Sequence, residues 1–316
     1  MVAEPWISPT GQRMRRLELH ITYTCPERCS FCSEDHRMKA FSAFPVTFGR
    51  VTRVLREQAS RGVESVHFTG GEPTIHPQFV DILTVGKQLG MRTSIGTIGT
   101  RLADPAFAAK AMPWLDEALF SLHGPDAATH DAATGRPGSF DRVMRAVANA
   151  KEKPGFRPYF NTVVTRENLP RLPETAALVD ALGAALLIVS NVTPEGKGAD
   201  DYDTLTVRLP EMSAVAADVV AAAPRTIVRF FGLPMCALGS ARMNSNDLYW
   251  NPRVTVEWAA KPGAVALEGI YSWAPDRGRR HAAACDGCGY AGVCAGVFGA
   301  YLDRFGGAEI SALEAT

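Results

Sequence analysis

The chain has 316 residues, 46% of them hydrophobic, which is enough to bury the core of one large domain with or without a small appendage. Basic and acidic residues both number 33, so no excess of positive charge indicates a nucleic-acid or membrane-surface partner. No apolar run reaches membrane-spanning length and the start lacks a signal-peptide pattern, so the sequence predicts a cytoplasmic protein without a membrane anchor.

Strand-like and helix-like segments alternate after a polar lead-in at residues 1–16. The strands are expected at residues 17–23, 64–69, 91–97, 117–121, 158–165 and 185–191. The helices are expected at residues 46–61, 77–89, 103–113, 140–150 and 172–182. Such alternation predicts a parallel α/β sheet that curls into a full or partial barrel, with a doubly wound sheet as the alternative. In a barrel, the active site lies at the carboxyl ends of the strands.

The pattern changes after about residue 194. Residues 196–224 are expected to form a connecting region with an alanine- and valine-rich helix at 211–223. Short strands separated by turns follow at residues 226–231, 247–250 and 254–258, which predicts a small α+β unit over residues 225–316. The basic run at residues 277–280 is expected to be a solvated loop.

Three of the seven cysteines lie within eight residues, at Cys25, Cys29 and Cys32, directly after the first expected strand. An odd cysteine count in a reducing compartment favours metal binding or catalysis over disulfides. Three thiolates on one loop can hold three corners of an iron–sulfur cube and leave the fourth iron open. Zinc is an alternative, but it needs a fourth ligand, and His36 is the only one nearby.

A second motif, Gly70-Gly71-Glu72-Pro73, follows the second expected strand. Its glycines allow the backbone to come close to a ligand, and its carboxylate can meet a cationic group. Alone this motif is often only a turn. Placed one β/α unit after a C-x3-C-x2-C loop, it makes the chain resemble the radical S-adenosylmethionine (radical SAM) enzymes.

The resemblance implies a partial (β/α)6 TIM-like barrel over residues 17–195. It also implies that a [4Fe-4S] cluster on Cys25, Cys29 and Cys32 binds S-adenosylmethionine and reductively cleaves it, so that a 5′-deoxyadenosyl radical takes hydrogen from a substrate. A small electron donor of the flavodoxin or ferredoxin type is implied as a partner. The positions that match cofactor contacts in the family are Phe31 near the adenine, Gly70, Gly71, Glu72 and Pro73 near the amino group, and the polar Ser121 and Asn161. Loop packing and hydrogen bonds to the backbone are their alternative roles.

The remaining four cysteines form a second candidate site. They are Cys236, Cys285, Cys288 and Cys294. Four thiolates suit either a fully ligated cluster or structural zinc. The resemblance favours a twitch-type subdomain, a hairpin and a helix around one auxiliary [4Fe-4S] cluster used for electron transfer. Residues 254–258 would then be a hairpin strand and residues 293–305 the closing helix, with Tyr301 and Phe305 on one face.

Two related architectures do not fit the sequence. The SPASM extension has seven cysteines for two auxiliary clusters, more than the four left here. The GTP cyclase of molybdenum-cofactor synthesis ends in Gly-Gly, whereas this chain ends in Ala315-Thr316, and its auxiliary cluster keeps three cysteines instead of four.

The expected substrate is a peptide, because the cysteine-rich tail resembles that of maturases of ribosomally made peptides. Only about 16 residues precede the barrel, however, so no separate leader-binding domain is expected there. The alternatives are oxidation or rearrangement of a small natural-product precursor and, from another class, a non-catalytic iron–sulfur or zinc protein. Tyr249, Trp250, Trp258 and Arg242 are expected near the barrel mouth or in the packing of the small unit, and no residue acting on the substrate is assigned.

Overall fold

The computed structural model describes residues 4–261, 263–275 and 277–314. Its main feature is a nine-stranded sheet in the order β7-β6-β5-β4-β3-β2-β1-β8-β9. The strands are β1 (Arg16–Thr22), β2 (Ser65–Gly70), β3 (Arg92–Thr97), β4 (Glu117–Ser121), β5 (Tyr159–Val164), β6 (Leu186–Asn191), β7 (Ile227–Phe231), β8 (Arg253–Lys261) and β9 (Ala264–Ser272). Strands β1 to β7 are parallel and lie in chain order, β8 adds in parallel to β1, and β9 is antiparallel to β8.

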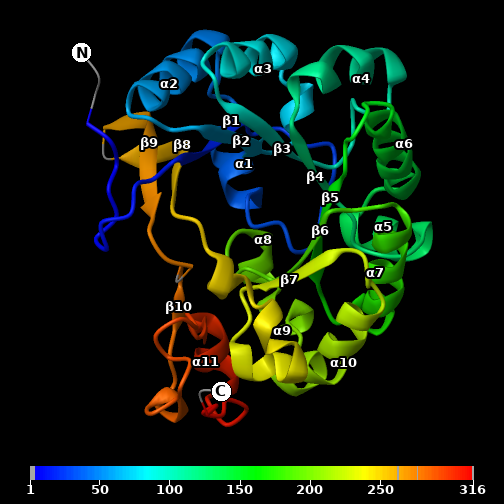
Figure 1. The fold of residues 1–316 in the computed structure, drawn as a ribbon, viewed down its shortest axis with the longest axis vertical. Coiled ribbons are helices and arrows are strands. Elements are labelled where there is room, and N and C mark those ends of the chain that lie inside the picture. The colour runs from blue at the N-terminus through cyan, green and yellow to red at the C-terminus, as the bar shows by residue number, and fades with distance from the viewer. Residues whose placement is uncertain (1–3, 262, 276, 315–316) are drawn as a thin grey trace.

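Helices cover the outer face of this curved sheet (Figure 1). They include α2 (Phe48–Ser60), α3 (Phe79–Gln88), α4 (Pro105–Ala111), α5 (Ala127–Thr134), α6 (Ser139–Lys151), α7 (Leu172–Ala181) and α10 (Leu209–Ala221). The structure also contains the short helices α1 (Asp35–Phe41), α8 (Lys197–Asp200), α9 (Tyr202–Leu205) and α11 (Gly299–Phe305). Because the strands follow one another around the sheet without a reversal of order, the partial barrel is confirmed and the doubly wound alternative is excluded.

Helix α6 illustrates why these segments fold onto the sheet. Its buried residues Val143, Ala146, Val147 and Ala150 recur at the spacing that puts them on one face of a helix. In strand β1 the side chains point alternately to the two faces of the sheet. Leu17, Leu19 and Ile21 are fully buried against the helices, and the residues between them line the interior of the barrel. The apolar core therefore lies between sheet and helices, and the inside of the barrel is polar.

The parallel sheet continues one strand further than the sequence predicts. The run at residues 226–231, expected in the small unit, forms β7 and pairs with β6. Helix α10 supplies the crossover between them, and Val228 and Phe230 are buried while Ile227 is exposed. The β/α alternation thus extends beyond the point where the composition changes. The domain boundary at residue 225 stays a prediction.

The expected hairpin at residues 254–258 is present as β8 and β9, joined to the barrel sheet through β1. The expected helix at residues 293–305 is shorter, since α11 begins at Gly299. Before it, Gly296 adopts a positive φ of 80°, and β11 (Val297–Phe298) pairs with β10 (Arg279–Arg280). Tyr301 and Phe305 do share a face, with ring centroids 4.8 Å apart.

The basic run at residues 277–280 is not uniformly solvated. The side chain of Arg279 is buried and forms an ion pair of 2.7 Å with the buried Asp247. Its neighbours Arg277 and Arg280 are exposed and pair with Glu195 and Asp303. The solvated-loop expectation is therefore wrong for Arg279, because a carboxylate from a distant segment provides it with a buried partner.

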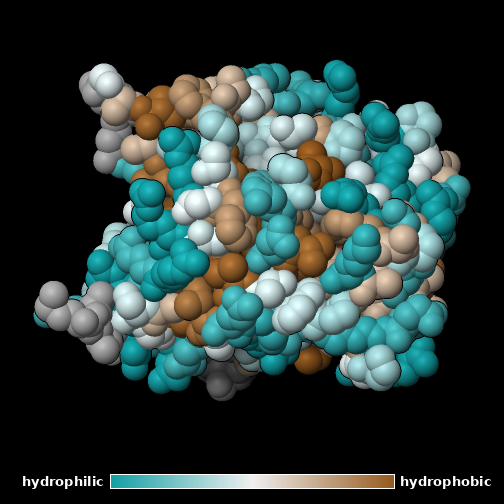
Figure 2. Space-filling model, turned by 90° about the horizontal axis from the view of Figure 1, so that it is seen from above, coloured by the Kyte–Doolittle hydropathy of each residue, from teal (hydrophilic) through white to brown (hydrophobic). Residues whose placement is uncertain are grey.

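Viewed from above, polar side chains cover most of the molecular face and apolar ones are interspersed among them (Figure 2). No helix in the part of the chain that the structure describes is long and apolar enough to cross a membrane.

Candidate functional site

The cysteine loop follows β1 and is held in place by helix α5, which lies outside the sheet. Cys25, Cys29 and Cys32 are partly buried free thiols. The backbone N–H groups of Arg28 and Ser30 donate to carbonyl oxygens at the end of α5, at 2.9 and 3.3 Å. The loop is thus anchored by its backbone, which leaves the three thiols free to bind a ligand.

The chemistry of these thiols fits a metal cluster. Burial raises the pKa of Cys25 to about 12 and that of Cys32 to about 11, so a thiolate needs a cationic group to compensate for its desolvation. A single zinc ion in a structural site takes four protein ligands, one more than these three thiols. His36, the candidate fourth zinc ligand, is exposed and contacts Asp200 at 2.9 Å. His36 is thus engaged elsewhere, which disfavours a single zinc ion on this loop.

The Gly-Gly-Glu-Pro motif lies directly beside the chain that leads into Cys25. The N–H groups of Gly71 and Glu72 donate to the carbonyl oxygens of Thr22 and Thr24, at 2.8 and 2.9 Å. A Cβ atom on Gly70 would lie 2.2 Å from the Thr22 oxygen, and one on Gly71 would lie 2.1 Å from the Thr24 oxygen. Only glycine permits this approach, so the two motifs are brought together by backbone packing at the ends of β1 and β2.

The Glu72 carboxylate is completely buried and has several protein donors. It accepts hydrogen bonds from Thr74 N at 3.1 Å, Thr97 Oγ1 at 2.8 Å and Ile98 N at 2.8 Å, and also contacts the Thr74 hydroxyl. Burial raises the pKa of Glu72, although the hydrogen bonds from these donors act to lower it. Glu72 therefore ties the end of β2 to the end of β3, and a contact with a cofactor stays a prediction.

The other predicted cofactor contacts lie at the same rim. The buried Phe31 ring packs edge-on against His123, with centroids 4.7 Å apart, and His123 follows the end of β4. Ser121 and Asn161 are register partners across β4 and β5. Asn161 Oδ1 accepts a hydrogen bond of 2.6 Å from Ser190 Oγ and lines the barrel interior. The fold brings these residues together, while their contacts with a cofactor stay predictions.

The barrel encloses a polar cavity of about 460 Å³, lined by inward side chains of β1 to β7 and by the segment at residues 246–253. A second cavity of about 250 Å³ continues it toward the cysteine loop. Of the aromatic and basic residues expected near the mouth, Tyr249 and Trp250 line the larger cavity. Trp258 is instead buried beside Tyr23, and Arg242 is half-buried and donates to the Gly239 carbonyl.

Burial and nearby charged groups determine the charge state of the side chains in the cavity wall. Burial alone would raise the pKa of Glu18, but Arg253, 3.0 Å away, outweighs it and lowers the pKa to about 2. Burial lowers the pKa of His67 to about 3, so this imidazole is neutral. The cavity thus contains fixed positive and negative groups together with a neutral histidine.

The four remaining cysteines line one pocket at the C-terminal end of the chain. Cys236 comes from the 3-10 segment η4 (Met235–Asn244), and the other three lie between β10 and β11. Backbone N–H groups approach two of the sulfurs: Met235 and Gly296 point to Cys294, at 3.5 and 3.4 Å, and Leu313 points to Cys288 at 3.4 Å. Such donors are typical around metal-bound thiolates.

One group of potential ligands was not predicted from the sequence. His20, Glu34 and Glu257 meet beside the cysteine loop, although they come from three separate segments. His20 and Glu34 have a local signal, because they lie just before and just after the cysteine loop, whereas Glu257 has none.

Comparison with known proteins agrees with the site. The family model of the radical SAM superfamily matches residues 19–179, just over half of the chain. The PqqA peptide cyclase of Gluconobacter oxydans is 30% identical over 58% of this chain and 51% of its own length. The AdoMet-dependent heme synthase of Methanosarcina barkeri is 28% identical over 61% of this chain and 54% of its own. The chain spans about half the length of the curated relatives it matches.

A solved structure supports the same fold. SuiB of Streptococcus suis, crystallised with S-adenosylmethionine, superposes with a TM-score of 0.62 at 16% identity and covers 95% of this chain and 76% of its own. Together with the paired motifs at the rim of β1 and β2, the family match establishes that this chain belongs to the radical SAM superfamily.

Proposed function

We propose that Cys25, Cys29 and Cys32 hold a [4Fe-4S] cluster that binds S-adenosylmethionine, and that the enzyme abstracts hydrogen from a peptide substrate. The observation that carries the proposal is the direct backbone pairing of the Gly70-Gly71 loop with the chain entering Cys25, next to a polar cavity. When bound and reduced, the cluster supplies the electron that cleaves S-adenosylmethionine to methionine and a 5′-deoxyadenosyl radical.

The role of the protein is to bind, orient and exclude water. We assign the adenine to the side of Phe31, and we assign hydrogen bonds to the cofactor to Ser121 and Asn161. The backbone of the loop from Gly70 to Pro73 would meet the amino group, with Glu72 holding that loop against β3. These residues lie on strands or on the loops that directly follow them, which suits the precise placement that hydrogen abstraction needs.

We further propose that Cys236, Cys285, Cys288 and Cys294 hold an auxiliary [4Fe-4S] cluster for electron transfer. The common pocket and the N–H groups directed at two of the sulfurs support it. Residues 225–316 would then form a twitch-like unit after a lead-in at 1–16, a barrel at 17–195 and a connecting region at 196–224. Reducing electrons would come from a small flavodoxin- or ferredoxin-type protein.

The peptide substrate is supported by the relatives named peptide cyclases, and by a mycofactocin maturase among the matched proteins. The cavity of about 250 Å³ beside the cysteine loop offers room for a side chain of such a peptide. A second candidate is a small natural-product precursor, which is favoured by the relatives named heme synthases.

Deuterium transfer distinguishes these substrates. Reconstituted enzyme is incubated anaerobically with reductant, S-adenosylmethionine and extract of the native host grown on deuterated medium. Transfer of deuterium into 5′-deoxyadenosine identifies hydrogen abstraction from an extract component. We expect prior digestion of the extract with peptidases to abolish the transfer. Transfer that survives digestion would contradict the peptide assignment and support a small molecule.

A further inference from the structure

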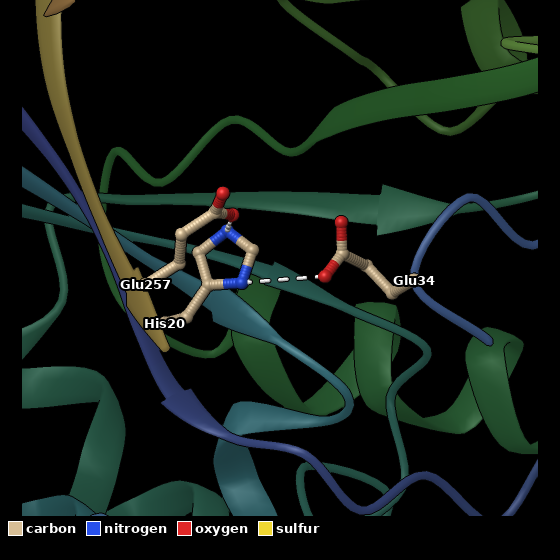
Figure 3. A group of neighbouring side chains, drawn as sticks. All are labelled: His20, Glu34 and Glu257. Carbon is tan, nitrogen blue, oxygen red and sulfur yellow. Dashed lines mark ion pairs between the residues drawn. The ribbon is translucent and has the colours of Figure 1, made fainter. Parts of the chain in front are cut away.

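A histidine and two glutamates converge beside the cysteine loop (Figure 3). His20 comes from β1, Glu257 from β8, and Glu34 from the residue just before α1. Glu34 Oε2 lies 3.4 Å from His20 Nδ1, and Glu257 Oε2 lies 3.7 Å from His20 Nε2. The strands β1 and β8 are direct neighbours in the sheet, so two of the three side chains are placed by its regular pairing.

Their ligand atoms have no hydrogen-bond partner among the described residues. This applies to His20 Nδ1, Glu34 Oε2 and Glu257 Oε2, all of which are buried. His20 is only 4% exposed and Glu257 only 2%. Separations of 3.4 and 3.7 Å are longer than good hydrogen bonds, and leaving such groups unpaired in the interior is costly. The arrangement therefore indicates an occupant that the protein itself does not provide.

Arg37 holds both carboxylates from the other side. Its guanidinium contacts Glu257 Oε1 at 2.7 Å and Glu34 Oε1 at 3.2 Å. One oxygen of each glutamate is thus fixed by Arg37, and the other is left facing the imidazole.

We propose that His20, Glu34 and Glu257 bind a divalent cation of the Mn²⁺, Fe²⁺ or Zn²⁺ class. One imidazole nitrogen and two carboxylate oxygens suit these ions, and the three ligand atoms lie within 4.8 Å of one another. His20 and Glu34 also line the cavity at the barrel mouth. Coordination positions not used by the protein therefore face this cavity, where water or an anionic group of a ligand can fill them.

The experiment measures Mn²⁺ uptake by reconstituted holoenzyme after a chelator wash that leaves the clusters in place. Free Mn²⁺ is followed by its EPR signal during titration. We expect about one Mn²⁺ per chain. His20→Asn and Glu257→Gln should each weaken binding by about 10- to 100-fold or more, the range measured when even an outer partner of a metal ligand is lost. Glu195→Gln is the matched control, because Glu195 lines the same cavity but pairs with Arg277.

Each result bears on the site itself. No Mn²⁺ uptake by the parent protein would overturn the proposal and leave an imidazole held between two carboxylates. Equal Mn²⁺ uptake by the parent and both variants would overturn it as well, since His20 and Glu257 would then not be ligands. A loss of uptake in Glu195→Gln as large as in the two variants would also overturn it, since the cation would then respond only to the general charge of the cavity. Circular dichroism and the iron content of each variant show whether its fold and clusters are retained. If one of the two variants fails to fold, the other still tests the proposal.

Discussion

Cys25, Cys29 and Cys32 follow a central strand of a nine-stranded sheet, whereas Cys285, Cys288 and Cys294 lie on a segment whose regular elements have two or three residues each. The first loop is placed by backbone pairing with the end of β2 and with α5. The second segment is held mainly by Arg279, which donates to Asp247, Leu233 O and Gly296 O.

The difference lies in what supports each set of thiols. At the rim of the barrel the fold itself fixes the loop, so a bound group adds chemistry to a structure that already exists. In the C-terminal segment we expect one buried ion pair and the proposed auxiliary cluster to order the chain together, because small units bury too little apolar surface on their own. Asp247 also accepts the N–H of Ala295, next to Cys294, which couples the ion pair directly to a thiol.

The largest effect is expected from removing one set of thiols at a time. Replacing Cys25, Cys29 and Cys32 by alanine should lower the iron content from about eight to about four atoms per chain, because each cube contains four irons. Replacing the four later cysteines should lower it to the same value but also reduce thermal stability. Iron and zinc analysis with thermal melts checks both. A zinc signal that depends on the later cysteines would contradict the auxiliary cluster.

Asp247→Asn tests the support of the C-terminal unit. It leaves the buried Arg279 without a charged partner, which we expect to cost about 3 to 5 kcal/mol. Iron should be lost from the auxiliary site and retained at the barrel rim. Asp303→Asn is the matched control, since Asp303 pairs with the neighbouring Arg280 at the surface. Similar losses in both variants would show that the buried pair has no special role.

Gly71→Ala tests the backbone packing of the first site. A Cβ atom would lie 2.1 Å from the Thr24 carbonyl oxygen, so the loop must shift. We expect a loss of about 1 to 3 kcal/mol in unfolding free energy, weaker binding of S-adenosylmethionine and unchanged iron. Chemical denaturation and equilibrium dialysis measure these. Gly49→Ala, in helix α2 with open space around it, should leave binding unchanged. Unaltered binding in Gly71→Ala would count against the assigned position of the loop.

The smallest effect is expected from Glu72→Ala. The donors Thr97 Oγ1 and Ile98 N lose their acceptor, and the loop loses its tie to β3. S-adenosylmethionine binding should weaken by about 1 kcal/mol, or roughly fivefold, with the iron content unchanged. Glu64→Ala, an exposed residue just before the start of β2, serves as the control. Affinity equal to that of the parent would contradict a role for Glu72 in the cofactor site.

Much of the barrel could be predicted because its strands and helices have strong local periodicity. Strand β7 could not be assigned to the barrel, because its five-residue apolar run resembles any short strand until its pairing with β6 is known. The addition of β8 to β1 is likewise a contact between residues more than 200 positions apart. Pairing at such separation leaves no periodic signal in the sequence.

The same distinction applies to the sites. The cysteine loop and the Gly-Gly-Glu-Pro motif are contiguous, and their residue types restrict the chemistry strongly. Arg279 was misjudged because its burial depends on Asp247, which is 32 residues away. Glu257 could not be connected with His20 and Glu34 because single carboxylates are common on protein surfaces and only the sheet order brings these three together.

The most direct test of the central claim is the formation of 5′-deoxyadenosine. Anaerobically reconstituted protein is incubated with dithionite and S-adenosylmethionine, and the products are separated by liquid chromatography with mass detection. The parent protein should release 5′-deoxyadenosine and methionine, and the Cys25, Cys29 and Cys32 triple alanine variant should release neither. Absence of 5′-deoxyadenosine from parent protein that carries its full iron content would contradict the assigned chemistry.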